Sequence, residues 1–236
     1  MRGFIPNALT LSNLLCGALA LVACLMGMDL SLSAFLILMA AGFDFLDGMV
    51  ARALGVSGEL GKQLDSLADV ISFGLVPGAM LFRLWMGPEF ILYESLEFHP
   101  ALFGFLFSAA AAYRLGKFNI DESQSHGFKG LPTPAASLFV LSIPLIQRFE
   151  PESFLAPIFE TSSFYPVAMV CLSLAMLSNF PLIALKFKSL KFKENLLKYI
   201  LILGSLVLVL IFHFTAIPIV LLLYLLISIA DKLIDS

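Results

Sequence analysis

The chain has 236 residues, of which 60% are hydrophobic and only 13% are charged, and its mean hydropathy is +0.97. Soluble domains are about 45–50% apolar and about 25% charged, so this composition excludes an ordinary soluble globule, a disordered chain and a nucleic-acid-binding protein. The net charge of −3 says little, because in a membrane protein the position of each charge matters more than the sum. We therefore expect an integral membrane protein.

Eight apolar runs follow one another along the chain, several of them near the roughly 20 residues that a helix needs to cross a bilayer. The first run is long and further runs follow it, so we expect a membrane helix there rather than a cleavable signal peptide. The fold class expected is all-α, a polytopic bundle of about eight transmembrane helices. No repeat divides the chain, and we expect one membrane domain over 1–236, with a catalytic core at about 5–180 and additional helices at about 181–236. The expected helices cover residues 6–28, 31–54, 63–86, 98–117, 133–148, 164–179, 196–213 and 216–234.

The basic residues predict the orientation of these helices. Eight crossings place both termini on one side, and that side collects 12 of the 14 Lys and Arg residues, leaving only Arg83 and Arg148 on the other. The positive-inside rule makes the basic side cytoplasmic, so we expect both termini in the cytoplasm and the protein in the cell (inner) membrane. The basic run 186–193 is expected to lie on anionic membrane lipids.

Four aspartates interrupt the apolar pattern, at the end of the second expected helix and the start of the third. A charged side chain costs about 2.5–3.5 kcal/mol at the centre of a membrane helix on insertion scales. Asp44 and Asp47 are three residues apart, and Asp65 and Asp69 are four apart, so each pair shares one helix face. Two antiparallel helices would bring these faces together. Carboxylates without histidine suit a hard cation such as Mg²⁺ or Mn²⁺, and a cluster of this charge has the capacity for two ions.

The run from Asp44 to Asp69 reads D-x2-D-G-x2-A-R-x8-G-x3-D-x3-D. It resembles the signature of the CDP-alcohol phosphotransferase family at every fixed position. The resemblance implies two divalent cations, Mg²⁺ or Mn²⁺, held by Asp44, Asp47, Asp65 and Asp69, at an active site that faces the cytoplasm. It also implies that Asp69 is the general base toward the acceptor hydroxyl. The residues it implies for binding CDP-diacylglycerol are Asn7, Thr10, Gly48, Arg52, Ser57 and Gly58.

Four further stretches resemble the branch of this family that uses L-serine as the acceptor: 5–13, 61–74 followed by Pro77-Gly78, 113–119 and 128–136. The resemblance then implies transfer of a phosphatidyl group from CDP-diacylglycerol to the serine hydroxyl with release of CMP, by a homodimer. Cytoplasmic cations can hold the serine carboxylate. The candidate serine-binding residues are Arg114, Lys117, Asn119, Lys129 and Thr133.

Other functions remain open at this stage. A phosphorylated acceptor suits the same cations, so the synthesis of phosphatidylglycerophosphate or phosphatidylinositol phosphate is an alternative within the family. An ion transporter also carries membrane carboxylates, but it predicts inverted repeats and a site near the midplane. Prenyltransferases use aspartate-rich metal motifs without the G-x2-A-R-x8-G segment found here. The choice between Mg²⁺ and Mn²⁺, and between acyl and ether lipids, is also open.

Overall fold

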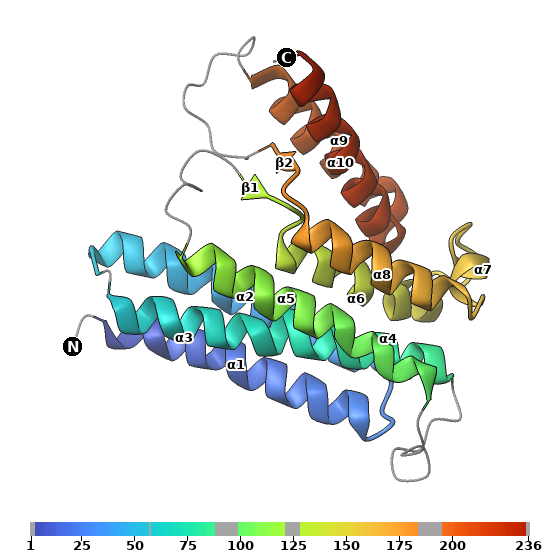
Figure 1. The fold of residues 1–236 in the computed structure, drawn as a ribbon, viewed down its shortest axis with the longest axis horizontal. Coiled ribbons are helices and arrows are strands. Elements are labelled where there is room, and N and C mark those ends of the chain that lie inside the picture. Colours follow the sequence, from blue (N-terminus) through green and yellow to red (C-terminus); the bar gives the residue numbers. More distant parts are fainter. Residues whose placement is uncertain (1–2, 57, 88–98, 121–127, 184–194, 235–236) are drawn as a thin grey trace.

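The computed structural model describes residues 3–56, 58–87, 99–120, 128–183 and 195–234, and nearly all of these residues are helical (Figure 1). Helices α1 (Phe4–Leu25) and α2 (Leu30–Leu54) pack against each other as an antiparallel hairpin. The carboxylate of Asp29 caps α2 by accepting a hydrogen bond from the backbone N–H of Ser31 at 2.9 Å. Gly55 ends α2 with φ +62°, a left-handed conformation that glycine adopts without strain. Both ends of α2 are therefore encoded locally.

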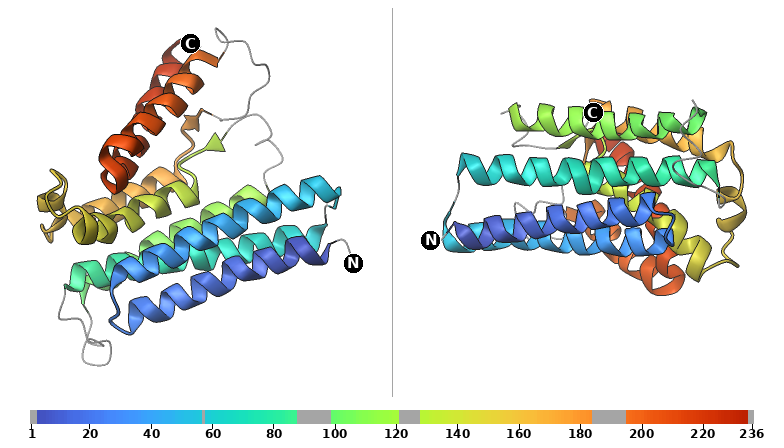
Figure 2. Two further views of the ribbon diagram at one scale, coloured as in Figure 1. Left: turned by 180° about the vertical axis from the view of Figure 1, so that it is seen from behind. Right: turned by 90° about the horizontal axis from the view of Figure 1, so that it is seen from below.

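The third helical stretch, Glu59–Met86, lies at the centre of the structure. It consists of α3 (Glu59–Asp69), a π-helical segment (Val70–Leu75) and α4 (Val76–Met86). Figure 2 shows this stretch between the layer of α1 and α2 on one side and α5 on the other. About 67% of the residues in its most apolar 18-residue segment are buried, a larger share than in the other long helical stretches. The sequence predicted one helix here and did not predict the π-helical segment.

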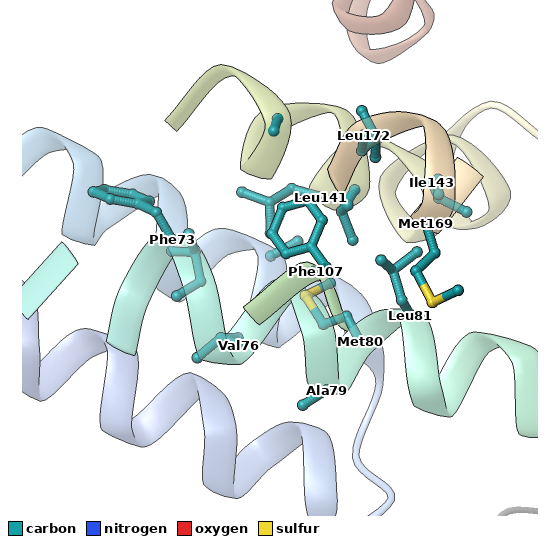
Figure 3. Packing of buried hydrophobic residues seen from close by; sticks show 14 of the residues in the cluster. Phe73, Val76, Ala79, Met80, Leu81, Phe107, Leu141, Ile143, Met169 and Leu172 are labelled. Carbon is teal, nitrogen blue, oxygen red and sulfur yellow. The ribbon is translucent and has the colours of Figure 1, made fainter. Parts of the chain in front are cut away.

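The second half of the chain covers α4 with shorter helices. A 3₁₀ segment (Pro100–Gly104) leads into α5 (Phe105–Ile120), and α6 (Thr133–Phe149), α7 (Ala156–Phe159) and α8 (Phe164–Leu177) follow. Their buried side chains meet those of the central stretch in one core (Figure 3). Phe73, Met80, Phe107, Leu141 and Leu172 are among the residues that fill it. This core fixes the position of the central stretch, which carries two of the four aspartates.

The last two helices form a hairpin that is steeply inclined to the rest of the bundle (Figure 1). They are α9 (Leu196–Phe212) and α10 (Ala216–Ile234), joined by a 3₁₀ turn at His213–Thr215. The carboxylate of Glu150 accepts hydrogen bonds from the backbone N–H groups of Phe214 at 2.7 Å and Thr215 at 2.9 Å. Glu150 thereby ties the turn to the end of α6.

A short antiparallel pair of strands was not predicted. Strand β1 (Phe128–Lys129) pairs with β2 (Pro181–Leu182), so that Phe128 faces Leu182 in the register. The pair joins the segment before α6 to the segment after α8.

The structure confirms the all-helical class, and each of the eight expected ranges contains a helix. The number of membrane crossings is a different matter, because α5, α6 and α8 have only 16, 17 and 14 residues. Among the described residues, four helical stretches are long and apolar enough to cross a membrane by length and composition, so the expected eight crossings are not shown. These stretches are Phe4–Leu25, Leu30–Leu54, Glu59–Met86 and Leu196–Leu233, the last of which contains both α9 and α10.

Candidate active site

Three of the four predicted aspartates form a cluster between α2 and α3. Asp44 and Asp47 project from α2 and Asp65 projects from α3, and each offers a carboxylate oxygen within 4.8 Å of the other two. Asp47 is buried, whereas Asp44 and Asp65 are partly buried. The i, i+3 spacing on α2 places both of its carboxylates on one face, which is directed toward Asp65. The cluster can hold a metal ion, because three converging carboxylate oxygens match the ligand preference of hard divalent cations.

Asp69 lies one helical turn beyond Asp65 and is buried, with 9% of its surface exposed. Its carboxylate is not part of the group of three whose oxygens converge. The amide Nδ2 of Asn13 on α1 donates a hydrogen bond to Asp69 Oδ1 at 3.2 Å. The structure therefore separates one aspartate from the metal-competent three, which is compatible with a different role for Asp69.

The predicted nucleotide-binding residues line one cavity beside this cluster. The cavity has a volume of about 620 Å³ and includes Asp47 and Asp65 in its wall. Gly48 leaves space for the Arg52 side chain, because a Cβ there would lie 3.4 Å from Arg52 Nη1. Of the six predicted contacts, Ser57 lies outside the described residues, and the other five line the cavity: Asn7, Thr10, Gly48, Arg52 and Gly58.

Thr10 has a contact that the sequence did not predict. Its hydroxyl lies 2.5 Å from Asp47 Oδ2 and 3.1 Å from the carbonyl oxygen of Pro6, one turn earlier in α1. Thr10 is itself buried, with 4% of its surface exposed. It therefore connects α1 directly to the acidic cluster as well as lining the cavity.

Three of the five predicted serine-binding residues meet at a second, much smaller cavity. Arg114, Lys117 and Lys129 line a space of about 20 Å³ near the end of α5. Lys117 Nζ donates a hydrogen bond to Asn179 Oδ1 at 2.9 Å. Asn179 follows α8 and had no predicted role, since its distance from the signature in sequence gave no signal.

Backbone geometry explains how Lys129 reaches this cavity. Gly130 adopts φ +74°, and a Cβ there would lie 2.5 Å from the carbonyl oxygen of Ser178. Its backbone N–H donates to the carbonyl oxygen of Phe180 at 2.9 Å, and that of Leu131 donates to Ala175 at 2.9 Å. Only glycine permits this close approach without strain. The segment that carries Lys129 is thus held against the end of α8.

The other two predicted serine-binding residues lie at different places. Thr133 is fully buried, and its hydroxyl accepts a long hydrogen bond of 3.5 Å from Arg114 Nη1. Among the described residues, the Nε of Arg114 is buried without a hydrogen-bond partner.

Asn119 contacts α3 instead of the small cavity. Its side-chain Nδ2 donates to Ser66 Oγ at 2.7 Å, and its backbone carbonyl oxygen accepts from Lys62 Nζ at 2.9 Å. Asn119 therefore borders the acidic site.

The fold and the site together define a class: a helical integral membrane protein whose carboxylates suit a metal-dependent displacement at a phosphate. A family model described as CDP-alcohol phosphatidyltransferase matches residues 3–226. The chain belongs to this family. It is accordingly an enzyme with CDP-alcohol phosphatidyltransferase activity, as the signature in the sequence predicted.

Several curated relatives of this chain carry names from one branch of the family. A CDP-diacylglycerol–serine O-phosphatidyltransferase of Bacillus subtilis is 33% identical over 135 residues, which is 57% of this chain and 72% of the relative. An enzyme of the same name from Helicobacter pylori strain 26695 is 31% identical over 209 residues, 86% of this chain and 81% of the relative. An archaetidylserine synthase of Methanothermobacter thermautotrophicus is 33% identical over 144 residues, 60% of this chain and 58% of the relative.

Proposed function

We propose that this protein transfers a phosphatidyl group from CDP-diacylglycerol to the hydroxyl of L-serine, giving phosphatidylserine and CMP. The observation that carries the proposal is the 620 Å³ cavity, in which Asp47 and Asp65 share a wall with Arg52. A guanidinium beside metal-binding carboxylates suits a pyrophosphate. The family gives the reaction class, and serine as acceptor is supported by the names of the relatives.

On this proposal, the donor occupies the large cavity, with its acyl chains in the lipid. We assign Asp44, Asp47, Asp65 and Asp69 as ligands of two divalent cations, Mg²⁺ or Mn²⁺. When bound, the cations neutralise the pyrophosphate and stabilise the charge that develops on the departing CMP. Arg52 binds a phosphate of the donor directly. The other residues assigned to the donor are Asn7, Thr10, Gly48, Ser57 and Gly58.

Asp69 is assigned as the general base. It accepts the proton of the serine hydroxyl as the hydroxyl oxygen attacks the phosphorus attached to diacylglycerol. The bond between that phosphorus and the CMP oxygen breaks in the same displacement, and CMP leaves with the electron pair. A carboxylate is a weak base for an alcohol, so the positions of the reacting groups must contribute a large part of the rate.

The small cationic cavity is assigned to the acceptor. Arg114, Lys117 and Lys129 supply positive charge for the serine carboxylate, and Thr133 orients Arg114. Asn119, which the sequence also suggested, would act from the side of α3. The same cations suit a phosphorylated acceptor, so the synthesis of phosphatidylglycerophosphate or phosphatidylinositol phosphate is the second candidate.

The membrane arrangement also remains a proposal. We propose one domain over 1–236 in the cell (inner) membrane, with about eight crossings, both termini in the cytoplasm and the acidic site facing the cytoplasm. The N-terminal end of α1 and the connection between α2 and α3 lie at the same end of the bundle, which supports a shared side for the terminus and the site (Figure 1). The basic run 186–193, proposed to contact anionic lipids, lies outside the described residues. A homodimer is proposed from the family resemblance.

An acceptor panel tests the proposed function. The purified protein is incubated with CDP-diacylglycerol and Mn²⁺, and CMP release is followed with L-serine, glycerol phosphate or inositol phosphate as the acceptor. We expect release with serine to exceed that with either phosphorylated acceptor. An Asp44→Asn variant under the same conditions gives the background. Faster release with a phosphorylated acceptor would transfer the assignment to the second candidate.

A further inference from the structure

Asn13 is a buried polar residue in the middle of the apolar helix α1. None of its surface is exposed, and none of the roles assigned above uses it. An amide side chain buried in a membrane helix is costly unless hydrogen bonds compensate for the lost water. The contacts of Asn13 therefore show what this residue does in the structure.

Among the described residues, Asn13 makes two hydrogen bonds outside its own helix, and both reach the central helical stretch. Its side-chain Nδ2 donates to Asp69 Oδ1 at 3.2 Å, and its backbone carbonyl oxygen accepts from Ser72 Oγ at 3.2 Å. Ser72 lies in the π-helical segment that begins directly after Asp69. One turn further along α1, a Cβ on Gly17 would lie only 2.4 Å from Ser72 Oγ, so α1 approaches this segment closely. Asn13 is thus fixed against the residues on both sides of the end of α3.

The hydrogen bond from Asn13 is important for the orientation of the Asp69 carboxylate. Within the described part of the chain, the hydrogen bond from Asn13 is the one shown to the Asp69 side chain. A hydrogen bond to one oxygen restricts the rotation of a buried carboxylate, and Asn13 does not engage the second oxygen of Asp69. Thr10, one turn before Asn13, makes the corresponding contact with Asp47. Helix α1 therefore supplies a donor to the acidic cluster and another to the separate aspartate.

Asn13 is not the residue that stability alone would select. Its Oδ1 is buried without a hydrogen-bond partner among the described residues, and a buried polar atom left unpaired destabilises the fold. An aliphatic side chain of similar volume would avoid that cost inside an apolar helix. The hydrogen bond to Asp69 is what such a side chain would lose.

We propose that Asn13 is a positioning residue that orients the Asp69 carboxylate toward the acceptor hydroxyl. This inference rests on the proposed function, in which Asp69 is the general base. Asn13 acts through Asp69 and touches neither substrate. Asn13 bonds Asp69 and none of the three aspartates whose oxygens converge, so its loss leaves three of the four proposed metal ligands untouched. Asn13 should therefore affect turnover more than the binding of metal or donor.

The test compares Asn13→Leu, which keeps the volume and removes the donor, with Asn13→Gln, which keeps an amide. Ser12→Ala is the matched control, because within the described part of the chain the Ser12 hydroxyl bonds the carbonyl oxygen of Ala8 in its own helix, at 2.9 Å, and no other helix. For Asn13→Leu we expect kcat to fall about 10–100-fold, the usual effect of losing a residue that orients a functional group. The KM for CDP-diacylglycerol should stay within about twofold of the unmodified protein, and the Mn²⁺ affinity should fall by a smaller factor than kcat. Asn13→Gln should recover part of the loss, and an unchanged kcat in Asn13→Leu would overturn the proposal.

A double variant separates this proposal from the proposed function. If Asn13 acts through Asp69, Asn13→Leu combined with Asp69→Asn should be no slower than Asp69→Asn alone, whichever acceptor the protein prefers in the panel. A further multiplicative loss would contradict the inference while leaving the choice of acceptor untouched. Thermal unfolding in detergent gives a readout that needs no turnover. The Tm shifts of the two single changes should be clearly non-additive in the double variant, and additive shifts would overturn the contact itself.

Discussion

The hydroxyl of Thr10 on α1 lies 2.5 Å from Oδ2 of Asp47 on α2, so the first helix of the chain contacts the acidic cluster directly. Groups that orient a metal ligand typically contribute about 10–100-fold to metal affinity. We predict that Thr10→Val lowers the affinity for Mn²⁺ by this factor, measured by calorimetry in detergent. Thr10→Ser keeps the hydroxyl and should stay close to the unmodified protein. Equal affinities in Thr10→Val and Thr10→Ser would show that the contact does not support a metal site.

The acidic cluster predicts that activity depends on a divalent cation. Clustered carboxylates repel the pyrophosphate of the donor unless positive charge lies between them. EDTA should therefore abolish CMP release, and excess Mg²⁺ or Mn²⁺ should restore it. EDTA saturated with Mg²⁺ beforehand is the control for effects of the chelator itself. Full activity after thorough chelation would exclude the proposed metal site.

The small cationic cavity predicts a selective effect on the acceptor. Arg114→Ala and Lys129→Ala should each raise the KM for serine more than the KM for CDP-diacylglycerol, because both residues line that cavity and not the large one. Asn179→Ala should act in the same direction, since it releases Lys117 from the hydrogen bond at 2.9 Å. Lys198→Ala on α9 removes a charge elsewhere and serves as the control. If serine kinetics do not change in Arg114→Ala and Lys129→Ala, these cations only orient the protein in the membrane.

The sequence predicted correctly those features that depend on a single helix. The approximate positions of all eight expected helices follow from apolar runs, and the spacing of Asp44 and Asp47 places both on one face. The sequence did not predict side-chain contacts that depend on how one helix is rotated relative to another. Asn119 was grouped with Lys117 because they are neighbours in sequence, but Asn119 contacts Ser66 across the interface with α3. The roles of Asn13 and the π-helical segment required the structure for the same reason.

Short elements and loops were also beyond the sequence signal. The pairing of Phe128 with Leu182 joins positions more than fifty residues apart, and neither two-residue strand has enough length to show an alternating pattern. The helix α7 has only four residues, too few for a helical period to be visible. Both elements lie between longer helices that were predicted.

At the opposite end of the bundle from the aspartate cluster, Asp29 predicts a pH dependence of stability. The backbone N–H of Ser31 holds the pKa of Asp29 below its ordinary value, and the guanidiniums of Arg148 and Arg83 lower it further. A lowered pKa means that the stabilisation is present above the ordinary aspartate pKa and is lost as pH falls through the lowered value. Asp29→Asn keeps a capping side chain and removes the charge. Because Arg148 Nε is 3.5 Å from Asp29 Oδ2 at an exposed position, the loss at neutral pH should be about 0.2–1 kcal/mol.

Thermal unfolding in detergent at several pH values measures this effect. The difference in Tm between Asp29→Asn and the unmodified protein should be present at neutral pH and shrink in strong acid. Arg148→Gln should show the same trend with a smaller amplitude, since it leaves the cap intact. A difference that stays constant down to strong acid would mean that the charge of Asp29 does not contribute.

The variants Asp65→Asn and Asp69→Asn should lose different steps of the reaction. Asp65→Asn removes charge from the converging group, so metal affinity and donor binding should both fall. Asp69→Asn leaves that group intact and removes the proton acceptor, so donor binding should persist while turnover drops by about 10²–10⁴. Calorimetry with CDP-diacylglycerol and CMP release measure the two quantities separately. Retained turnover in Asp69→Asn would place the base elsewhere.

The most direct test of the central claim follows labelled L-serine into lipid. Purified protein with CDP-diacylglycerol and Mn²⁺ should form labelled phosphatidylserine and CMP in equal amounts, and Asp65→Asn at the same concentration of folded protein should form neither above background. Release of CMP without label in the lipid, or incorporation of serine that Asp65→Asn supports equally well, would contradict the account.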